Sequence, residues 1–523
     1  MSHDPSHAVS TVQHPVAPPQ MPPSPPRTQG EHRPRAVPLY AAAQSGEHDS
    51  LWEELRARYG AVAPVEILPG VSGWLLLGYH ENLDALRDRS RFSADPSRCP
   101  YAHNGQMPQP SAGQSQRTLA GDGPEHRRLR APIVDALTRL HAPKVTETIN
   151  RIASELIDNV ATKGTADLIG EYAAPLPALV LNQLFGLDDE YGRLLADLSA
   201  TLWDGDPESV QWATNQIHAY FAALVARKRA SPGNDITSWL LEHPSNLTDK
   251  EAAEELTLMW AAGHEPTTHL IGNALRRLLA DPEITAAYGG VTLPAEDFID
   301  YVMWVDPPLQ TAASRFSAHD LRLGEADIKA GEALLLGFAP AHADPAVSAW
   351  QARDVMALAG NRAHLMWGAG AHGCPAQSLA REITTIAIDT VVNQLTNLHL
   401  AVDPQRLRWR SSLSVHGLVE LPVEFHPRES AQPAEDPQPQ HSRKRIFRKR
   451  HRAPSRGARY GAPGAAEKKT EPTTVVRAPR TAQQAPPSRG ARYGAPAAAT
   501  QAAEPSRDAL DHLLASWRDS KGG

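Results

Sequence analysis

A glycine-rich turn that leads directly into a helical pattern sets strict limits on the backbone around Cys374. Residues 367–376 read WGAGAHGCPA, and apolar residues then recur at helical spacing from Leu379 to Val391. Pro375 suits the first helical position, because its missing N–H costs nothing there and its φ is already helical. The pattern predicts Cys374 at about the N-cap, where free N–H groups and the helix dipole stabilise a negative sulfur.

The make-up of the turn favours a metal-ligating sulfur over a buried structural thiol. Gly368, Gly370 and Gly373 allow the backbone to fold tightly against a flat group and to aim amides at the sulfur. A lone Cys-Pro pair would favour the structural alternative. The three glycines, the tryptophan seven residues upstream and the histidine two residues before the cysteine favour a thiolate ligand for haem iron.

This segment resembles the haem-ligand loop of the cytochrome P450 family, with Trp367 where the family usually has Phe and Ala376 where it usually has Gly. The resemblance covers residues 37–427 in the family's order of segments. It implies a mainly α fold with small β sheets, the cytochrome P450 fold, with disordered termini. It also implies haem b (iron-protoporphyrin IX) as the cofactor and Cys374 as the ligand of its iron.

The resemblance extends to the cations that would hold the haem propionates. His126 and Arg130 lie four residues apart and therefore share one helix face, as in the family's His-x-x-x-Arg pair. Arg315 follows Pro307-Pro308 at the position of another propionate-binding arginine, and His372 is the fourth candidate. Each alone could be a surface cation, but together with Cys374 they indicate one site.

A second motif resembles the family's distal helix but departs from it at one position. Residues 261–268 read AAGHEPTT, in which Glu265 matches the acid of a proton relay. The alcohol normally follows the acid at once, but here Pro266 takes that place. A proline inside a helix removes one N–H and favours a kink. Thr267 lies about 100° further round the helix and is the remaining candidate for the relay alcohol.

The family's Glu-x-x-Arg pair is also missing. Counting back from Pro307 puts Tyr301 and Trp304 at those two positions. This pattern resembles an atypical actinobacterial subgroup in which Trp replaces the Arg. Aromatic packing can replace a buried ion pair, and we expect Asp300 to bind a nearby partner such as Arg362.

Patterns along the chain predict its organisation. Periodicity predicts a helix from residue 51, strands at 65–68 and 73–77, helices from 125 to 281, a strand-rich patch at 311–336 and short strands at 398–421. Proline crowds both ends of the 523-residue chain. We therefore expect a disordered Pro-rich extension at 1–36, a haem domain at 37–427, a disordered basic tail at 428–505 and a short amphipathic helix at 506–518.

Cysteine usage and hydropathy bear on location. The chain has two cysteines, Cys99 and Cys374, which does not suggest a disulfide scaffold. Cys99 precedes a proline in a loop and is expected to be an inert thiol. No run of apolar residues approaches the roughly 18–20 needed for a membrane helix, and no signal-peptide pattern is found. The expected location is the cytoplasm.

The C-terminal tail differs from the body in charge. Residues 441–523 hold 18 basic and 6 acidic residues, a net charge of +12, whereas the remainder carries −19. The basic cluster at 443–452 would bind polyanions in a salt-sensitive way and identifies no specific nucleic acid. PSRGARYGAP occurs twice, at 454–463 and 487–496.

Four apolar residues near the C-terminus fall on one helix face: Leu510, Leu513, Leu514 and Trp517. They predict either a helix that docks on a protein partner or a helix that packs on the chain's own body. Partner docking is the favoured alternative.

The resemblance implies a haem-thiolate monooxygenase that inserts one oxygen atom from O2 into an organic small molecule. Cys374 would ligate iron, and Glu265 with Thr267 would relay protons. No reductase domain is fused to the chain, so ferredoxin and ferredoxin reductase would supply electrons. The alternative is a non-catalytic or weakly catalytic haem protein that acts as a signalling or scaffold partner through its basic tail, since the Glu-x-x-Arg pair and the relay alcohol are both replaced.

Overall fold

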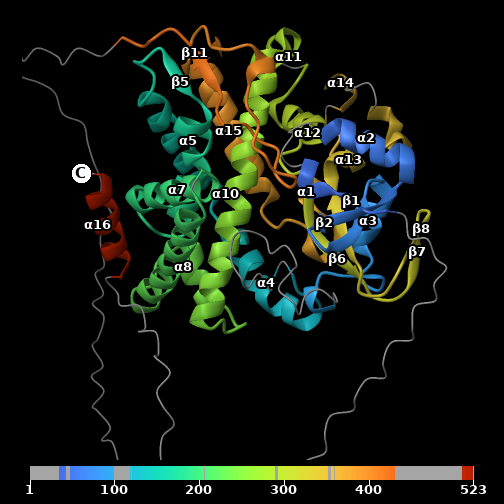
Figure 1. Cartoon of the computed structure of the whole chain (residues 1–523). Helices are drawn as coiled ribbons and strands as arrows, with labels where there is room; N and C mark the ends of the chain where they lie inside the picture. The colour runs from blue at the N-terminus through green and yellow to red at the C-terminus, as the bar shows by residue number, and fades with distance from the viewer. Residues whose placement is uncertain are drawn as a thin grey trace, which may run out of the picture. The chain divides into compact units, whose positions relative to one another are not determined.

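The computed structural model describes residues 35–42, 48–98, 118, 120–204, 206–288, 292–350, 355–358, 360–429 and 509–521. The described chain is mainly helical with three small sheets, as predicted. The helices α5–α10 gather on one side, and the largest sheet with α2 and α3 lies on the other (Figure 1). The chain divides into two units, residues 1–428 with 505–523, and residues 429–504.

The helices are α1 Leu39–Ala42, α2 His48–Tyr59, α3 Tyr79–Arg87, α4 Gly123–Thr138, α5 Ala142–Asp158, α6 Pro175–Leu184, α7 Asp189–Asp204, α8 Pro207–Ala230, α9 Ile236–Glu242, α10 Asp249–Ala280, α11 Pro282–Ala287, α12 Ala295–Val305, α13 Phe338–His342, α14 Val355–Leu358, α15 Gln377–Gln394 and α16 Ala509–Lys521. The strands are β1 Val37–Pro38, β2 Val62–Leu68, β3 Val71–Leu76, β4 Phe92–Ser93, β5 Thr165–Asp167, β6 Thr311–Ser317, β7 Leu321–Leu323, β8 Ala326–Ile328, β9 Ala333–Gly337, β10 His399–Leu400 and β11 Pro422–Glu424.

The largest sheet has the order β1-β2-β3-β9-β6-β4 and joins the start of the chain to residues 311–337. The predicted hairpin is present as β2 and β3, which pair antiparallel, and Gly70 supplies the positive φ (80°) of its turn. The predicted strands at 398–421 are mostly absent. That segment holds the two-residue β10 and isolated bridges such as Trp409 to Leu418, and β11 lies just after it.

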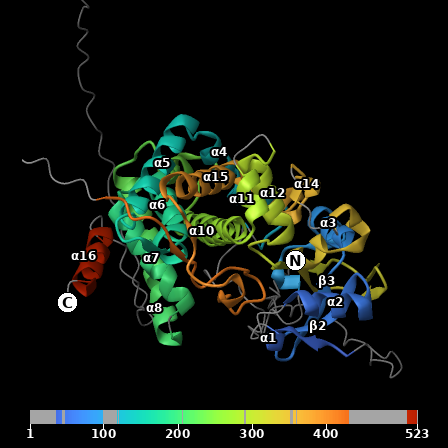
Figure 2. The same ribbon diagram turned by 90° about the horizontal axis from the view of Figure 1, so that it is seen from above.

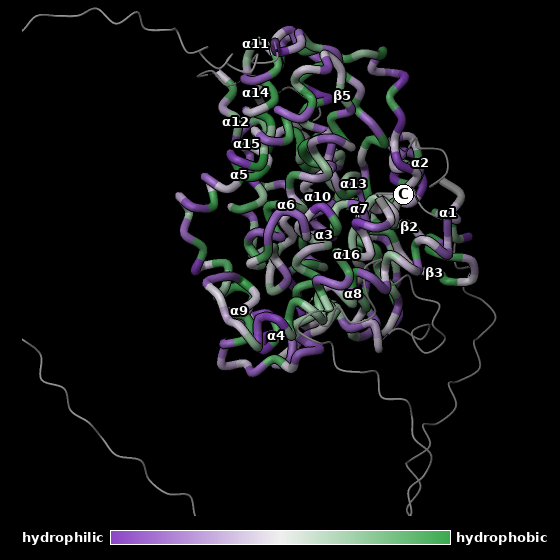
Figure 3. The backbone as a smooth tube through the Cα atoms, turned by 90° about the vertical axis from the view of Figure 1, so that its left-hand side faces the viewer, coloured by the Kyte–Doolittle hydropathy of each residue, from purple (hydrophilic) through white to green (hydrophobic). Residues whose placement is uncertain are grey.

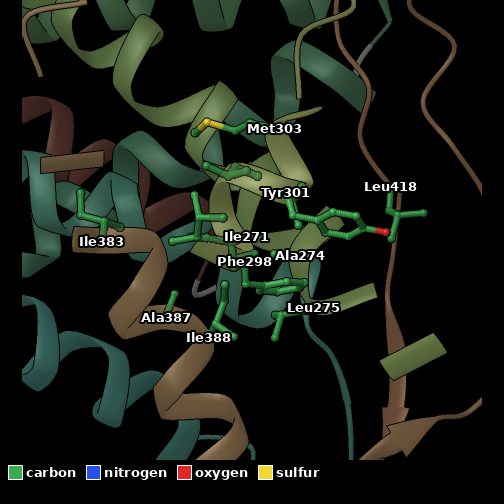
Figure 4. Packing of buried hydrophobic residues seen from close by; sticks show 14 of the residues in the cluster. Ile271, Ala274, Leu275, Phe298, Tyr301, Met303, Ile383, Ala387, Ile388 and Leu418 are labelled. Carbon is green, nitrogen blue, oxygen red and sulfur yellow. The ribbon is translucent and has the colours of Figure 1, made fainter. Parts of the chain in front are cut away.

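The largest hydrophobic cluster fixes three helices that later carry the site. Phe298 of α12 lies beside Ala274 and Leu275 of α10, whereas the ring of Tyr301 points toward Leu418 (Figure 4), and Ile383 and Ile388 of α15 belong to the same cluster. Apolar and polar residues alternate along the helices, as expected for amphipathic helices in layers (Figure 3). A second cluster joins α7, α8, α9 and α16 to the N-terminal part of α10.

Helix α10 runs through the centre of the helical half (Figure 2). A capping box starts it, since the Thr248 hydroxyl accepts from the Glu251 N–H and the Glu251 carboxylate accepts from the Thr248 N–H. The helix continues through Pro266, whose nitrogen cannot donate to the carbonyl of Ala262.

Several predictions concern segments outside the described residues. They include the Pro-rich extension up to residue 34, most of the basic tail at 430–508, and Cys99. The predicted C-terminal helix is present as α16 and packs on α7 and α8. Of the two alternatives, the helix on its own body is therefore observed, and its apolar face is covered. In the described parts of the chain, no helix is both long and apolar enough to cross a lipid bilayer.

Candidate active site

The turn before Cys374 is held by backbone hydrogen bonds and two glycines with positive φ. The Cys374 N–H donates to the Trp367 carbonyl at 2.7 Å, and Gly368 and Gly370 have φ of 64° and 68°. The helix starts later than predicted: α15 begins at Gln377 with Ala376 as N-cap, so Cys374 lies two residues before the cap.

Gly370 gives a direct test of this turn. A Cβ at Gly370 would lie 2.7 Å from the Leu86 carbonyl oxygen, which is backbone and cannot move aside cheaply. We expect Gly370→Ala to lower the free energy of unfolding by about 2–3 kcal/mol, from positive φ and from this clash. The matched control is Gly324→Ala, where φ is also positive (57°) and the nearest atom is 3.5 Å away. It should cost about 1 kcal/mol in the same denaturant titration. If both variants lose the same free energy of unfolding, the predicted clash at Gly370 does not occur.

The surroundings of the sulfur act on its charge in opposite directions. Burial raises the pKa of the Cys374 thiol, whereas the Ala376 N–H, which donates to it, and the Arg130 guanidinium lower the pKa. Arg130 also donates to the Gly373 carbonyl, so one side chain of α4 holds the turn and faces the sulfur. This arrangement favours a thiolate once a cation binds the sulfur.

The four predicted propionate-binding residues come together. His126 and Arg130 lie on α4, Arg315 on β6 and His372 in the turn before Cys374. The rings of His126 and His372 are 4.2 Å apart. Burial, with Arg315 and His126 as further causes, lowers the pKa of His372 to about 4. Burial and Arg130 also lower the pKa of His126, and burial lowers that of Arg315.

This cluster fits an anionic ligand. All four ring nitrogens of His126 and His372 are buried without a hydrogen-bond partner in the described part of the chain. The nearest carboxylate oxygen to His372 is that of Asp122, at 3.6 Å, beyond hydrogen-bond length. Buried polar groups without partners cost about 1–3 kcal/mol each. Two carboxylates beside a flat apolar group would satisfy these nitrogens and neutralise the arginines, so the residues fit haem with its propionates.

Two small residues of α10, Ala262 and Gly263, lie in different surroundings. Ala262 is exposed, whereas Gly263 faces Leu181 of α6, to which a Cβ would come within 3.1 Å. The glycine therefore permits close contact between α10 and α6. His264 is buried beside α7: its Nδ1 lies 3.2 Å from the Ser199 hydroxyl, and its Nε2 lies 2.9 Å from the Ala174 carbonyl.

The candidate relay residues directly follow His264 on α10. The Glu265 carboxylate is 3.3 Å from Nε2 of His269 and is partly exposed. Thr267 is buried, as is Thr268. The Thr268 hydroxyl has no hydrogen-bond partner among the described residues. The sequence predicted Thr267 and not Thr268, although both follow Pro266. The two residues are told apart by the structure, in which the buried hydroxyl of Thr268 makes no hydrogen bond with the described residues.

Asp300 on α12 is the buried centre of a cluster of ionisable side chains. Its carboxylate is fully buried on α12 and accepts hydrogen bonds from Arg381 of α15 and from His364, the latter at 3.1 Å. The expected partner Arg362 lies 3.4 Å from its second oxygen. One carboxylate therefore ties together the segment before the Cys374 turn and the helix after it.

Aromatic contacts complete this support. Trp304 donates its indole N–H to the Asn361 carbonyl at 2.8 Å, and its ring lies 4.6 Å from that of His342. His342 in turn accepts from the Leu365 N–H at 2.9 Å. Arg381 lies over the ring of Trp367 at 5.8 Å. The tryptophan thus binds backbone in the segment before the turn and packs on His342, whereas Asp300 of the same helix keeps an ion pair with Arg381.

Comparisons with known proteins agree with this architecture. No family model matches the chain. It is 30% identical over 379 residues to cytochrome P450 107B1 of Saccharopolyspora erythraea, covering 70% of this chain and 93% of that protein. It is also 30% identical over 405 residues to the vitamin D(3) 25-hydroxylase of Pseudonocardia autotrophica, covering 73% and 97%.

Solved structures give the same result. CYP154C4 from Streptomyces sp. W2061 superposes with a TM-score of 0.67 at 28% identity, covering 74% of this chain and 97% of that one. The tirandamycin C-bound P450 monooxygenase TamI superposes with a TM-score of 0.65 at 28% identity, covering 75% and 100%.

The fold and the cysteine turn define a haem-thiolate protein, and the chain belongs to the cytochrome P450 family. It is a monooxygenase, an oxidoreductase that inserts one oxygen atom into a small organic molecule. Its cofactor is haem, as the family implies. The comparisons give no support to the non-catalytic alternative.

Proposed function

We propose that residues 37–427 bind haem b between α10 and the turn before α15, with Cys374 as the iron ligand. His126, Arg130, Arg315 and His372 would bind the propionates. The observation that carries this assignment is the pair of buried imidazoles 4.2 Å apart, whose ring nitrogens make no hydrogen bond among the described residues, beside two buried or half-buried arginines. Bound haem supplies the iron at which O2 is activated. The protein orients the cofactor, keeps the sulfur buried and delivers protons.

Proton delivery is assigned to Glu265 with an alcohol beside it. Glu265 is partly exposed and 3.3 Å from His269, so it can exchange a proton with solvent and pass it along α10. Thr267 is the alcohol predicted from the sequence. Thr268 is a second candidate, because its buried hydroxyl is without a partner in the described chain and therefore available to a bound molecule or water.

Single substitutions test the relay. With NADH, a surrogate ferredoxin and its reductase, we expect Glu265→Gln to slow product formation by about 10²-fold, the usual share of one proton-transfer group. Thr267→Ala and Thr268→Ala should raise the share of NADH electrons that end in hydrogen peroxide. The larger rise should occur in the variant that lacks the relay hydroxyl. Thr257→Ala is the matched control, since its hydroxyl already donates to the Ala253 carbonyl one turn earlier. If both threonine variants form as much product per NADH consumed as the wild type does, neither hydroxyl belongs to the relay.

The partners follow from the same reaction. We assign electron supply to ferredoxin and ferredoxin reductase, in the cytoplasm, where NAD(P)H is available and a chain with two cysteines needs no disulfides. The substrate is proposed to be a small organic molecule, by analogy with a relative named vitamin D(3) 25-hydroxylase and with the structure of TamI bound to tirandamycin C. Spectral binding shifts of the ferric holoprotein across a metabolite panel test this class. A protein partner for the basic tail remains a further proposal.

A further inference from the structure

The C-terminal helix α16 covers a surface formed by α7 and α8. Leu510 and Leu514 are buried in the same hydrophobic cluster as residues of α7, α8 and the N-terminal part of α10. The face predicted from the sequence to be apolar is therefore the face that docks. Residues 430–508 separate α16 from the body in sequence and, at about 3.3 Å per extended residue, can reach any point on a domain of this size.

Polar contacts specify the docked position. Asp511 accepts from the Tyr191 hydroxyl and lies 2.7 Å from the Arg227 guanidinium. The Trp517 indole N–H donates to the Asp197 carboxylate at 2.8 Å. Arg518 pairs with Glu190. The contacts thus fall on two turns of α7 and one residue of α8.

Detachment of α16 is physically feasible. A 13-residue helix is marginally stable alone, so α16 gains its helical structure largely by docking. Asp511, Arg518 and Glu190 are substantially exposed, and such ion pairs contribute little. The attachment therefore depends mainly on three leucines and one tryptophan, Leu510, Leu513, Leu514 and Trp517, and its opening requires far less than global unfolding.

The docked surface connects to the distal helix. Asp197, which binds Trp517, lies two residues before Ser199 on α7. The Ser199 hydroxyl is 3.2 Å from Nδ1 of His264, the residue directly before Glu265. His264 also stacks on Trp260 of the second cluster, at 5.6 Å between ring centroids. A shift of α7 would therefore change contacts beside the relay carboxylate.

We propose that the docked α16 holds α7 and α8 against α10 and thereby slows exchange of small molecules with the haem site proposed between α10 and the turn before α15. The proposal rests on the proposed function, since it takes that site to be where haem and substrate bind. Any amphipathic helix that displaces α16 would release the restraint.

The main test compares full-length variants with matched charge. Leu510→Asp/Leu514→Asp places two carboxylates under α16, whereas Ala515→Asp/Ser516→Asp places two on its exposed face. In the first variant we expect faster amide hydrogen exchange in α7 and α8. We also expect stopped-flow association and dissociation rates of 4-phenylimidazole with the ferric holoprotein to rise at least fivefold. The second variant should behave as wild type.

A peptide and a milder variant provide two further tests of the docking site. A peptide of residues 505–523 added in trans should restore slow exchange in the leucine variant. If that variant does not fold, Trp517→Phe, which removes the bond to Asp197 and part of the ring that packs on the second cluster, should give a smaller rise in both rates. The proposal would be overturned if the amides of α16 exchange freely in the leucine variant while the amides of α7 and α8 exchange at wild-type rates. Hydrogen exchange does not need haem, so loss of the holoprotein spectrum alone would count against the proposed function and not against the docking site.

Discussion

Replacing Cys374 with serine is expected to abolish the red-shifted Soret band of the reduced, carbon monoxide-bound holoprotein, and with it monooxygenase activity. A serine hydroxyl stays protonated near neutral pH and donates far less electron density to iron than a thiolate does. The Ala376 N–H and Arg130, which lower the pKa of the thiol, have no comparable effect on a neutral hydroxyl. Of all substitutions in the chain, this one should have the largest effect on chemistry.

The chain provides its own control for this experiment. Cys99→Ser removes the other cysteine and should leave both the spectrum and the activity at wild-type values. Absorbance of each variant after dithionite reduction under carbon monoxide is the measurement. An unchanged spectrum in the Cys374 variant, or loss of the band in the Cys99 variant, would refute the assignment of the sulfur ligand.

The largest effect on stability is expected at Asp300. Asp300→Asn keeps the shape of the side chain but removes the charge that faces Arg381, whose side chain is only 14% exposed. An unpaired buried charge costs about 3–5 kcal/mol, so we expect the free energy of unfolding to fall by about 3 kcal/mol. Haem transfer from the holoprotein to an acceptor apoprotein should also become faster, because the segments on both sides of the Cys374 turn are released.

Glu296→Gln is the matched control for Asp300. Glu296 lies one turn earlier on α12 and pairs with the same Arg362 at 2.9 Å, but both side chains are more than half exposed. An exposed pair contributes about 0–1 kcal/mol, so this variant should unfold within 1 kcal/mol of wild type. Denaturant titrations of the apoproteins and the haem-transfer rate are the two measurements. A loss at Asp300 no greater than at Glu296 would show that the buried carboxylate does not support the turn.

Local sequence signals predicted much of the architecture. Helical periodicity placed α4 to α10, and the Pro69-Gly70 turn placed the β2–β3 hairpin, because amphipathic spacing and turn chemistry act over a few residues. The strands expected at 398–421 are mostly irregular, since their pairing depends on partners such as Leu309 that are distant in sequence.

Residue spacing predicted local geometry within the candidate site. His126 and Arg130 were expected to share one helix and both lie on α4, and Arg362 was expected beside Asp300 and is there. The contacts of Asp300 with His364 and Arg381 were missed, because they join three segments that only the tertiary fold brings together. The later start of α15 was missed for a similar reason: Arg130 of α4 fixes the turn by bonding Gly373.

The partnerless imidazoles of His126 and His372 also link folding to cofactor supply. Any ligand that binds the folded state and not the unfolded one raises stability by mass action, in proportion to the logarithm of its free concentration over its dissociation constant. Because haem would satisfy groups that the polypeptide alone leaves unsatisfied, the thermal midpoint should rise with free haem. Iron limitation in the cell would then reduce the folded population itself and expose the remainder to proteolysis, so the amount of enzyme would follow porphyrin supply without any change in transcription.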